Sequence, residues 1–264
     1  MLSGPDRAAG AGRRLVVLSI AMKAFLLAAG KGERLRPLTE DVPKCLLPIQ
    51  GTPLLALWLE NCRRAGINEV LINAHAHAAM VRDFVSRQER RISITVAEEA
   101  VLLGSAGTLA MNRAFVENEE TFYVLYADVL SNVTLPDMLA AHEETQSLAT
   151  LGVYQVPDPQ RCGVITFDSE RIVRSFVEKP AQPKSKWAFS GIMIARPEII
   201  DLVPPQRPAD IGFHLLPQLV GGMAAYPMDG FLMDIGTPEN YQAAQSLWPG
   251  FGQAVMKGDA CCKA

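Results

Sequence analysis

The first half of the chain alternates short apolar runs with amphipathic segments, and this alternation restricts the fold more than any other feature. The apolar runs have the length of buried strands and lie at 23–28, 69–74, 92–97 and 121–127. The helical patterns between them lie at 52–65, 78–87 and 105–112. Parallel strands joined by crossover helices give this order, so we predict a three-layer α/β/α, Rossmann-like fold with a mixed, mostly parallel sheet.

The second half, beyond Ala149, has a different pattern of residues. It contains β-rich runs broken by prolines and charged turns, namely LATLGVYQV, GVITFD, RIVRSFVE and WAFSGIMIA. We interpret these runs as further strands of the same sheet, followed by helical patterns at 213–220 and 237–247. Since 49% of the 264 residues are apolar, the chain can bury one large core. We expect one folded domain at 22–248, a disordered extension at 1–21 and a short tail at 249–264.

The charge balance excludes some classes of partner. The formal net charge of -3 and the pI near 5.9 provide no basic surplus for a nucleic-acid backbone. Arg13 and Arg14 precede an apolar run, as in a secretory signal, but the run is near the short limit and Lys23 interrupts it. No later segment is long and apolar enough to span a bilayer. We expect a cytoplasmic protein that starts at either Met1 or Met22.

The stretch LLAAGKGERLRPLTEDVPKCLLP, at 26–48, follows the first predicted strand directly. Ligands of α/β sheets bind at the carboxyl ends of the strands. Gly30 and Gly32 allow backbone N–H groups to approach phosphates closely. Three cations follow in the same stretch, Arg34, Arg36 and Lys44. This combination predicts a phosphate-binding loop.

Two better-known phosphate loops do not match this stretch. Leu35 replaces the third glycine of the dinucleotide-binding fingerprint, and no acidic residue closes the second strand to bind a ribose. The Walker pattern fails as well, because no Gly-Lys-Ser/Thr follows four residues after a glycine. The loop therefore favours neither a dehydrogenase nor a P-loop protein.

The loop resembles the signature of the sugar-1-phosphate nucleotidyltransferases, a Gly-rich, Arg-containing segment that ends in Pro-Lys. Further segments follow in the order of that family: LGSAGTLA (103–110), YADVLSN (126–132), FVEKP (176–180), FSGIMI (189–194) and FLMDIGTPENY (231–241). The resemblance covers about residues 23–248 and implies that 22–248 is a catalytic domain with the nucleotidyltransferase fold. It implies a Mg²⁺-dependent enzyme that moves a nucleotidyl group from a nucleoside triphosphate to a sugar 1-phosphate and releases pyrophosphate.

Asp128 and Asp234 each stand at the carboxyl end of an apolar strand pattern. Either aspartate alone also fits a turn or a helix cap. Occurring together, within the segments that resemble the family, they predict the ligands of one Mg²⁺ that bridges the triphosphate and the acceptor phosphate.

The same resemblance assigns the remaining site residues. It implies that Arg34 and Lys44 act with Asp128 as catalytic residues, hold the nucleotide phosphates and neutralise charge as pyrophosphate leaves. The nucleotide-binding residues that it implies are Ala28, Ala29, Gly30, Gly32, Glu33 and Gly107. The sugar-phosphate-binding residues that it implies are Glu178, Lys179 and Gly191.

Three positions depart from the family pattern. Cys45 follows Lys44 where proline is common, and Ala127 precedes Asp128 where glycine is frequent. Cys162 stands before a glycine where a tyrosine is frequent. None of these departures removes a charged group from the predicted chemistry, but the last leaves the sugar side of the site open.

The segment LGSAGT and the compact length resemble the guanylyltransferases that act on mannose or heptose 1-phosphate, without a hexapeptide-repeat domain. Three alternatives stay open. One is a uridylyl- or thymidylyltransferase acting on a hexose 1-phosphate, and another is a cytidylyltransferase acting on an alcohol phosphate. The third is a non-catalytic nucleotide-sugar-sensing subunit of the same fold. A homo-oligomer is compatible with each, and we expect neither nucleic acid nor a membrane as partner.

Overall fold

The computed structural model describes residues 22–88 and 91–252. The extension predicted at 1–21 and residues 253–264 of the predicted tail lie outside the described residues. In the part that is described, no helix is long and apolar enough to cross a membrane.

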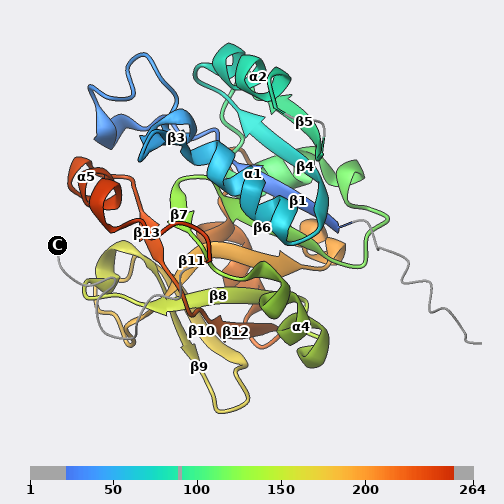
Figure 1. Ribbon diagram of the computed structural model, residues 1–264. Helices are drawn as coiled ribbons and strands as arrows, with labels where there is room; N and C mark the ends of the chain where they lie inside the picture. The colour runs from blue at the N-terminus through green and yellow to red at the C-terminus, as the bar shows by residue number, and fades with distance from the viewer. Residues whose placement is uncertain (1–21, 89–90, 253–264) are drawn as a thin grey trace, which may run out of the picture.

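A nine-stranded mixed sheet forms the centre of the molecule (Figure 1), with strand order β10-β9-β11-β6-β1-β4-β5, β8 beside β11 and β12 beside β8. The first-half strands are β1 (Met22–Leu27), β4 (Ile67–Ala74), β5 (Ser93–Glu98) and β6 (Phe122–Tyr126). They are mutually parallel, so their carboxyl ends meet at one edge. The predicted mixed sheet with parallel strands in its first half is confirmed.

The β-rich second half extends the same sheet, as predicted. Its strands are β8 (Ala149–Gln155), β9 (Gly163–Phe167), β10 (Val173–Glu178), β11 (Trp187–Ala195) and β12 (Met223–Pro227). β11 runs antiparallel to β6, β8 and β9, whereas β12 is parallel to β8. Two small separate sheets pair β2 (Pro48–Ile49) with β3 (Thr52–Pro53) and β7 (Val129–Ser131) with β13 (Leu232–Asp234).

The sheet is covered on both faces, which explains why its strands read as continuous apolar runs. Successive residues of β1 enter different cores, Leu26 one cluster and Phe25 the other. The first cluster includes residues of α1 (Leu54–Arg64), α2 (Ala78–Ser86), α4 (Leu135–Thr145) and α5 (Pro238–Leu247). The second includes residues of α3 (Ser105–Met111) and of the helical turns at 197–219. The sheet and the helices on its two faces are the three predicted layers.

The helical pattern predicted at 213–220 is present, but it starts two residues earlier and forms no α-helix. A five-residue π-helix, η6 (Ile211–Leu215), is followed there by a 3-10 turn, η7 (Leu216–Leu219). Pro217 has no N–H to continue an α-helical ladder, and Asp210 accepts hydrogen bonds from the first N–H groups of the turn. The helix α4, which was not predicted, starts after Thr134 with a proline in its first turn.

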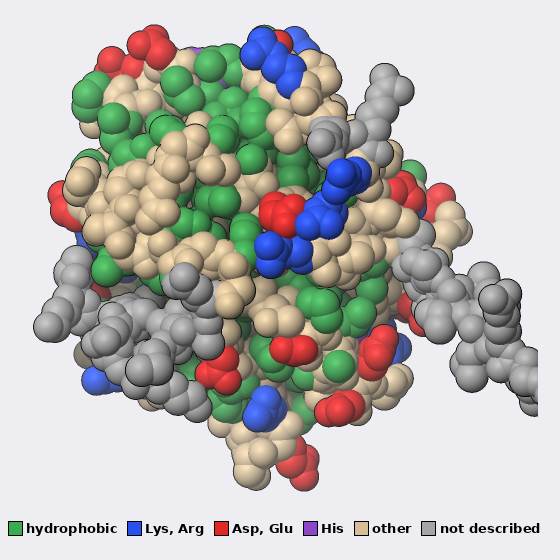
Figure 2. Space-filling model, in the orientation of Figure 1, with side chains coloured by type: hydrophobic (Ala, Val, Ile, Leu, Met, Phe, Trp, Pro, Cys, Tyr) green, Lys and Arg blue, Asp and Glu red, His purple; other side chains and the backbone are tan. Residues whose placement is uncertain are grey.

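The exposed side of α1 carries a small charged cluster. Glu60 accepts hydrogen bonds from Arg63 and Arg64, which lie three and four positions further along the helix. These pairs lower the pKa of Glu60 to about 2, chiefly through the hydrogen bond from Arg63. Figure 2 shows acidic and basic side chains side by side in the middle of this face, where α1 lies in Figure 1.

Candidate functional site

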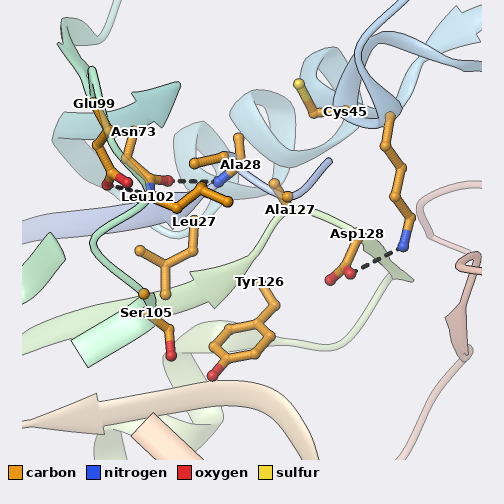
Figure 3. Close-up of a pocket in the computed structure, with 14 residues that line it drawn as sticks. Leu27, Ala28, Cys45, Asn73, Glu99, Leu102, Ser105, Tyr126, Ala127 and Asp128 are labelled. Atoms are coloured by element: carbon orange, nitrogen blue, oxygen red, sulfur yellow. Dashed lines mark hydrogen bonds and ion pairs between the residues drawn. The ribbon is translucent and has the colours of Figure 1, made fainter. Parts of the chain in front are cut away.

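A cavity of about 220 Å³ lies at the edge where the four parallel strands end. Five of the predicted site residues line it, Ala28, Ala29, Gly30, Lys44 and Asp128. Among the other lining residues, none of which was predicted as a site residue, Asn73, Glu99, Ser105 and Tyr126 carry polar side chains that the cavity can use. Figure 3 shows the strand-end loops converging on this space from several elements.

The glycine-containing loop after β1 is closed on itself. Gly32 has a left-handed backbone with φ of 66°, and its carbonyl accepts a hydrogen bond of 2.7 Å from the Thr39 hydroxyl. A Cβ at Gly32 would lie 2.9 Å from Cγ2 of Thr39, so both space and backbone require glycine there. Gly30 lines the cavity and is exposed, with no atom within 4 Å of a Cβ built there. The loop therefore presents open backbone to the cavity.

Lys44 brings a nearly buried ammonium between the two predicted metal ligands. Its Nζ lies 2.9 Å from Oδ2 of Asp128 and 3.5 Å from Oδ1 of Asp234, and the Lys44 side chain is 8% exposed. The dashed line to Asp128 in Figure 3 marks the shorter of these ion pairs. One lysine ammonium therefore lies between two aspartates that are far apart in the sequence.

The β7–β13 pair brings the two aspartates together. Asp234 pairs with Val129, the residue after Asp128, and the N–H of Ile235 donates to the Asp128 carbonyl over 3.1 Å. Trp58 of α1 donates its indole N–H to the Val129 carbonyl over 2.7 Å, which ties this small sheet to the core.

Arg34 reaches the same place through a close approach to Gly236. A Cβ at Gly236 would lie 2.8 Å from Nη2 of Arg34 and 3.1 Å from Nζ of Lys44. It would also lie 2.8 Å from Oδ1 of Asp234. The predicted catalytic and metal residues therefore gather around one glycine that leaves room for them.

This donor set fits a divalent cation of the magnesium type. Asp128 and Asp234 offer carboxylate oxygens that already face one cation, and their side chains are 41% and 46% exposed. No group of three or more His, Cys, Asp or Glu side chains suited to a metal occurs within 22–88 and 91–252. Two carboxylates with room for water and phosphate oxygens match the way Mg²⁺ is commonly bound with nucleotides.

A buried polar network supports the inner wall of the cavity. The N–H of Ala28 donates to Oδ1 of Asn73 over 2.7 Å, and Nδ2 of Asn73 donates to Oε1 of Glu99 over 2.9 Å and to the Thr108 hydroxyl over 3.0 Å. The Thr108 hydroxyl donates to the same Glu99 oxygen over 2.5 Å, and the N–H of Leu103 donates to Oε2. The sequence signal that was missed is the position of Asn73 and Glu99 at or just after parallel strand ends.

Gly107 lies within α3, one turn beyond the cavity wall formed by Gly104 and Ser105. Its N–H donates to the Ala209 carbonyl over 3.0 Å, and a Cβ on it would lie 2.9 Å from Cδ of Arg207. The structure thus brings Ser105 rather than Gly107 to the cavity surface. Glu33 is exposed and lies 3.8 Å from the Lys31 ammonium.

The predicted sugar-side residues do not line the cavity, but Gly191 and Glu178 lie near Tyr126, which does. Tyr126 lines the cavity, and burial raises its pKa, with further increases from the nearby carboxylates of Asp210, Asp128 and Glu178. Gly191 has φ of 79° and packs on this ring, because a Cβ there would lie 2.9 Å from Cβ of Tyr126. Glu178 and Lys179 follow at the end of β10.

Cys45 occupies the position where the family often has proline. The side chain is 2% exposed and lines the cavity, and burial raises the pKa of its thiol to about 12. A thiol with this pKa stays protonated near neutral pH, so Cys45 contributes an apolar surface and no nucleophile.

Comparison with known proteins agrees with this geometry. The model of the nucleotidyl transferase family matches residues 23–248, and the chain belongs to that family. It is 34% identical over 233 residues to mannose-1-phosphate guanyltransferase beta-A of Xenopus laevis, covering 86% of this chain and 64% of the relative. It is 33% identical to mannose-1-phosphate guanylyltransferase 1 of Arabidopsis thaliana over 234 residues, with the same coverage. The chain thus spans less than two thirds of the length of these relatives.

A solved structure supports the same fold assignment. It is described as a putative glucose-1-phosphate thymidylyltransferase from Bacillus anthracis in complex with a sucrose. The two chains share 25% identity and superpose with a TM-score of 0.77, covering 88% of this chain and 98% of the other.

Proposed function

We propose that this protein transfers a guanylyl group from GTP to mannose 1-phosphate, giving the nucleotide sugar and pyrophosphate. The observation that carries the proposal is the convergence of Arg34, Lys44, Asp128 and Asp234 at the cavity formed by the parallel strand ends. The names of the relatives support the choice of both substrates.

In the proposed reaction, an oxygen of the sugar 1-phosphate attacks the α-phosphorus of GTP in line, and the bond to pyrophosphate breaks. No protein nucleophile takes part, so catalysis consists of positioning and charge neutralisation. The backbone around Gly30 receives the phosphates, while Arg34 and Lys44 balance the charge on the leaving pyrophosphate. On nucleotide binding, the Lys44 ammonium exchanges its carboxylate partners for phosphate oxygens.

Asp128 and Asp234 are the residues that hold Mg²⁺ in this proposal. When bound, the ion supplies positive charge to the phosphate oxygens and orients them. Arg34 and Lys44 lie beside these two carboxylates, so the four side chains would act on one phosphate chain.

A matrix of nucleoside triphosphates against phosphorylated acceptors, read as Mg²⁺-dependent pyrophosphate release, tests the proposal. We expect the highest kcat/KM with GTP and mannose 1-phosphate, and no turnover in Asp128→Ala. Highest activity with dTTP or UTP and glucose 1-phosphate would contradict the guanylyl assignment. Tight nucleotide-sugar binding without turnover of any pair would identify a sensor instead.

A further inference from the structure

Glu178 lies in a notch formed by two glycines from different elements. A Cβ at Gly212 would lie 2.4 Å from Oε2 of Glu178, and a Cβ at Gly163 would lie 2.7 Å from the same oxygen. Real side chains do not approach so closely, so the carboxyl group occupies space that exists because both positions lack a Cβ. Burial raises the pKa of Glu178, Lys179 opposes this shift and Asp210 adds to it.

The turn that carries Gly212 is fixed by Asp210. Oδ1 of Asp210 accepts hydrogen bonds from the N–H groups of Gly212, over 2.8 Å, and Phe213, over 3.2 Å. The N–H of Asp210 donates to Nδ1 of His214 over 2.9 Å. These bonds hold the five-residue π-helix η6, a conformation that is rare and frequently found at functional sites.

The same turn is anchored to the cavity. The Ser105 hydroxyl, which lines the cavity, donates to Oδ2 of Asp210 over 3.0 Å and accepts from the N–H of Ile211 over 2.8 Å. The position of the turn is therefore set by the wall that faces the nucleotide.

The turn η6 also contacts Lys179, the residue that follows Glu178 in the sequence. The Lys179 ammonium lies 5.6 Å from the centre of the Phe213 ring, which is 52% exposed. Lys179 has a left-handed backbone with φ of 49°, so its side chain leaves the strand end in a direction that an extended residue does not take. Two adjacent residues of η6 thus contact two adjacent residues at the end of β10.

We infer that η6 is the positioning element of the sugar-1-phosphate subsite: Gly212 places the Glu178 carboxylate and Phe213 places the Lys179 ammonium. This inference rests on the proposed function and on the sequence-based prediction that Glu178 and Lys179 bind the sugar phosphate. In it, Glu178 accepts hydrogen bonds from sugar hydroxyls and Lys179 pairs with the acceptor phosphate. Gly212 and Phe213 are then positioning residues, because they act through Glu178 and Lys179.

Gly212→Ala tests the inference without removing any polar group. The atoms nearest to the added methyl group belong to the end of the Glu178 side chain, which can rotate, so we expect the fold to persist while the carboxylate is displaced. The KM for mannose 1-phosphate should rise roughly 10- to 100-fold, as for the loss of a hydrogen bond to a charged group, with the KM for GTP unchanged within about twofold. Phe213→Leu should raise the same KM about two- to fivefold.

A double-mutant cycle with Glu178→Ala separates positioning from a general structural effect. If Gly212 acts through Glu178, Gly212→Ala has no further effect in the Glu178→Ala background. Gly222→Ala serves as the matched control, because a Cβ there meets the Leu148 side chain at 3.3 Å, away from Glu178. Melting temperatures of all variants report on folding.

The inference is overturned if Gly212→Ala behaves as Gly222→Ala does, if it raises both KM values equally, or if its effect is the same with and without Glu178. A wild-type protein that turns over no pair of substrates overturns the proposed function itself, and this inference with it. The two failures are distinguishable, because only the second one abolishes wild-type pyrophosphate release.

Discussion

Lys44 holds one nearly buried ammonium between two half-exposed carboxylates, and this residue decides how the charges of the cavity are arranged. A phosphate chain that enters the cavity meets this cation beside the guanidinium of Arg34. Replacing the ammonium leaves Asp128 and Asp234 facing each other, but their exposure to solvent keeps their repulsion small. Loss of the Lys44 ammonium should therefore lower the rate with the triphosphate more than it lowers the stability of the fold.

At the residue scale we predict that Lys44→Met lowers kcat/KM for GTP about 10- to 100-fold, the effect of one lost charge-assisted hydrogen bond. Steady-state pyrophosphate release at subsaturating GTP measures this, and a melting curve checks that the variant is folded. An unchanged rate under these conditions would remove Lys44 from the site.

Asn73 links three elements at the level of secondary structure. Its side-chain amide joins the loop after β1, through the Ala28 N–H, to Glu99 after β5 and to Thr108 of α3. The residue is 4% exposed, so these partners have little access to water that could replace the amide. The orientation of the phosphate-binding loop therefore depends on a neighbouring strand.

At the element scale we predict that Asn73→Ala lowers the melting temperature by about 5–10 °C, from roughly 2–3 kcal/mol of unpaired buried polar groups. The KM for GTP should rise as well, because the Ala28 N–H loses its partner. Thermal unfolding and GTP kinetics measure the two effects, with the exposed Asn118→Ala as control. Wild-type values in both assays would show that the amide is dispensable.

At the scale of the whole molecule, a buried histidine couples folding to pH. His142 of α4 is 2% exposed, Nδ1 lies 2.8 Å from the Thr150 hydroxyl, and Nε2 has no partner. Burial, with a smaller contribution from Arg196, lowers the pKa of His142 to about 4. The unfolded chain then binds a proton near pH 6.5 that the folded protein binds only near pH 4.

We predict that the free energy of unfolding falls as the pH drops from about 6.5 to 4, by up to about 3 kcal/mol from this group. Between these values the unfolded state carries the extra proton, so acid favours unfolding. Urea unfolding of wild type and His142→Gln at pH 7 and pH 5 measures how steeply the free energy of unfolding of each protein depends on pH. Equal slopes for the two proteins would exclude His142 as the source.

The candidate site shows which parts could be predicted from sequence. The loop after β1 and the two aspartates were found because glycines, cations and carboxylates stand out at the ends of apolar runs. Asn73, Glu99, Ser105 and Tyr126 were missed, because each of these residue types is common elsewhere and acquires its role from a neighbouring strand. The helical pattern at 213–220 was predicted without its π-helical start at Ile211, since that geometry depends on Asp210 and Ser105.

The sequence by itself determined the alternation of strands and helices in the first half of the chain, the two covered faces of the sheet and the loop that presents Gly30. These follow from local patterns, the periodicity of apolar residues and the backbone freedom of glycine. Only the tertiary structure decided that Asp128 and Asp234 share one lysine. That meeting requires β7 to pair with β13 and α5 to dock on the β2–β3 segment, where Tyr241 and Gln245 donate to the Pro48 carbonyl. Such contacts join residues about a hundred or more positions apart, and no local pattern encodes them.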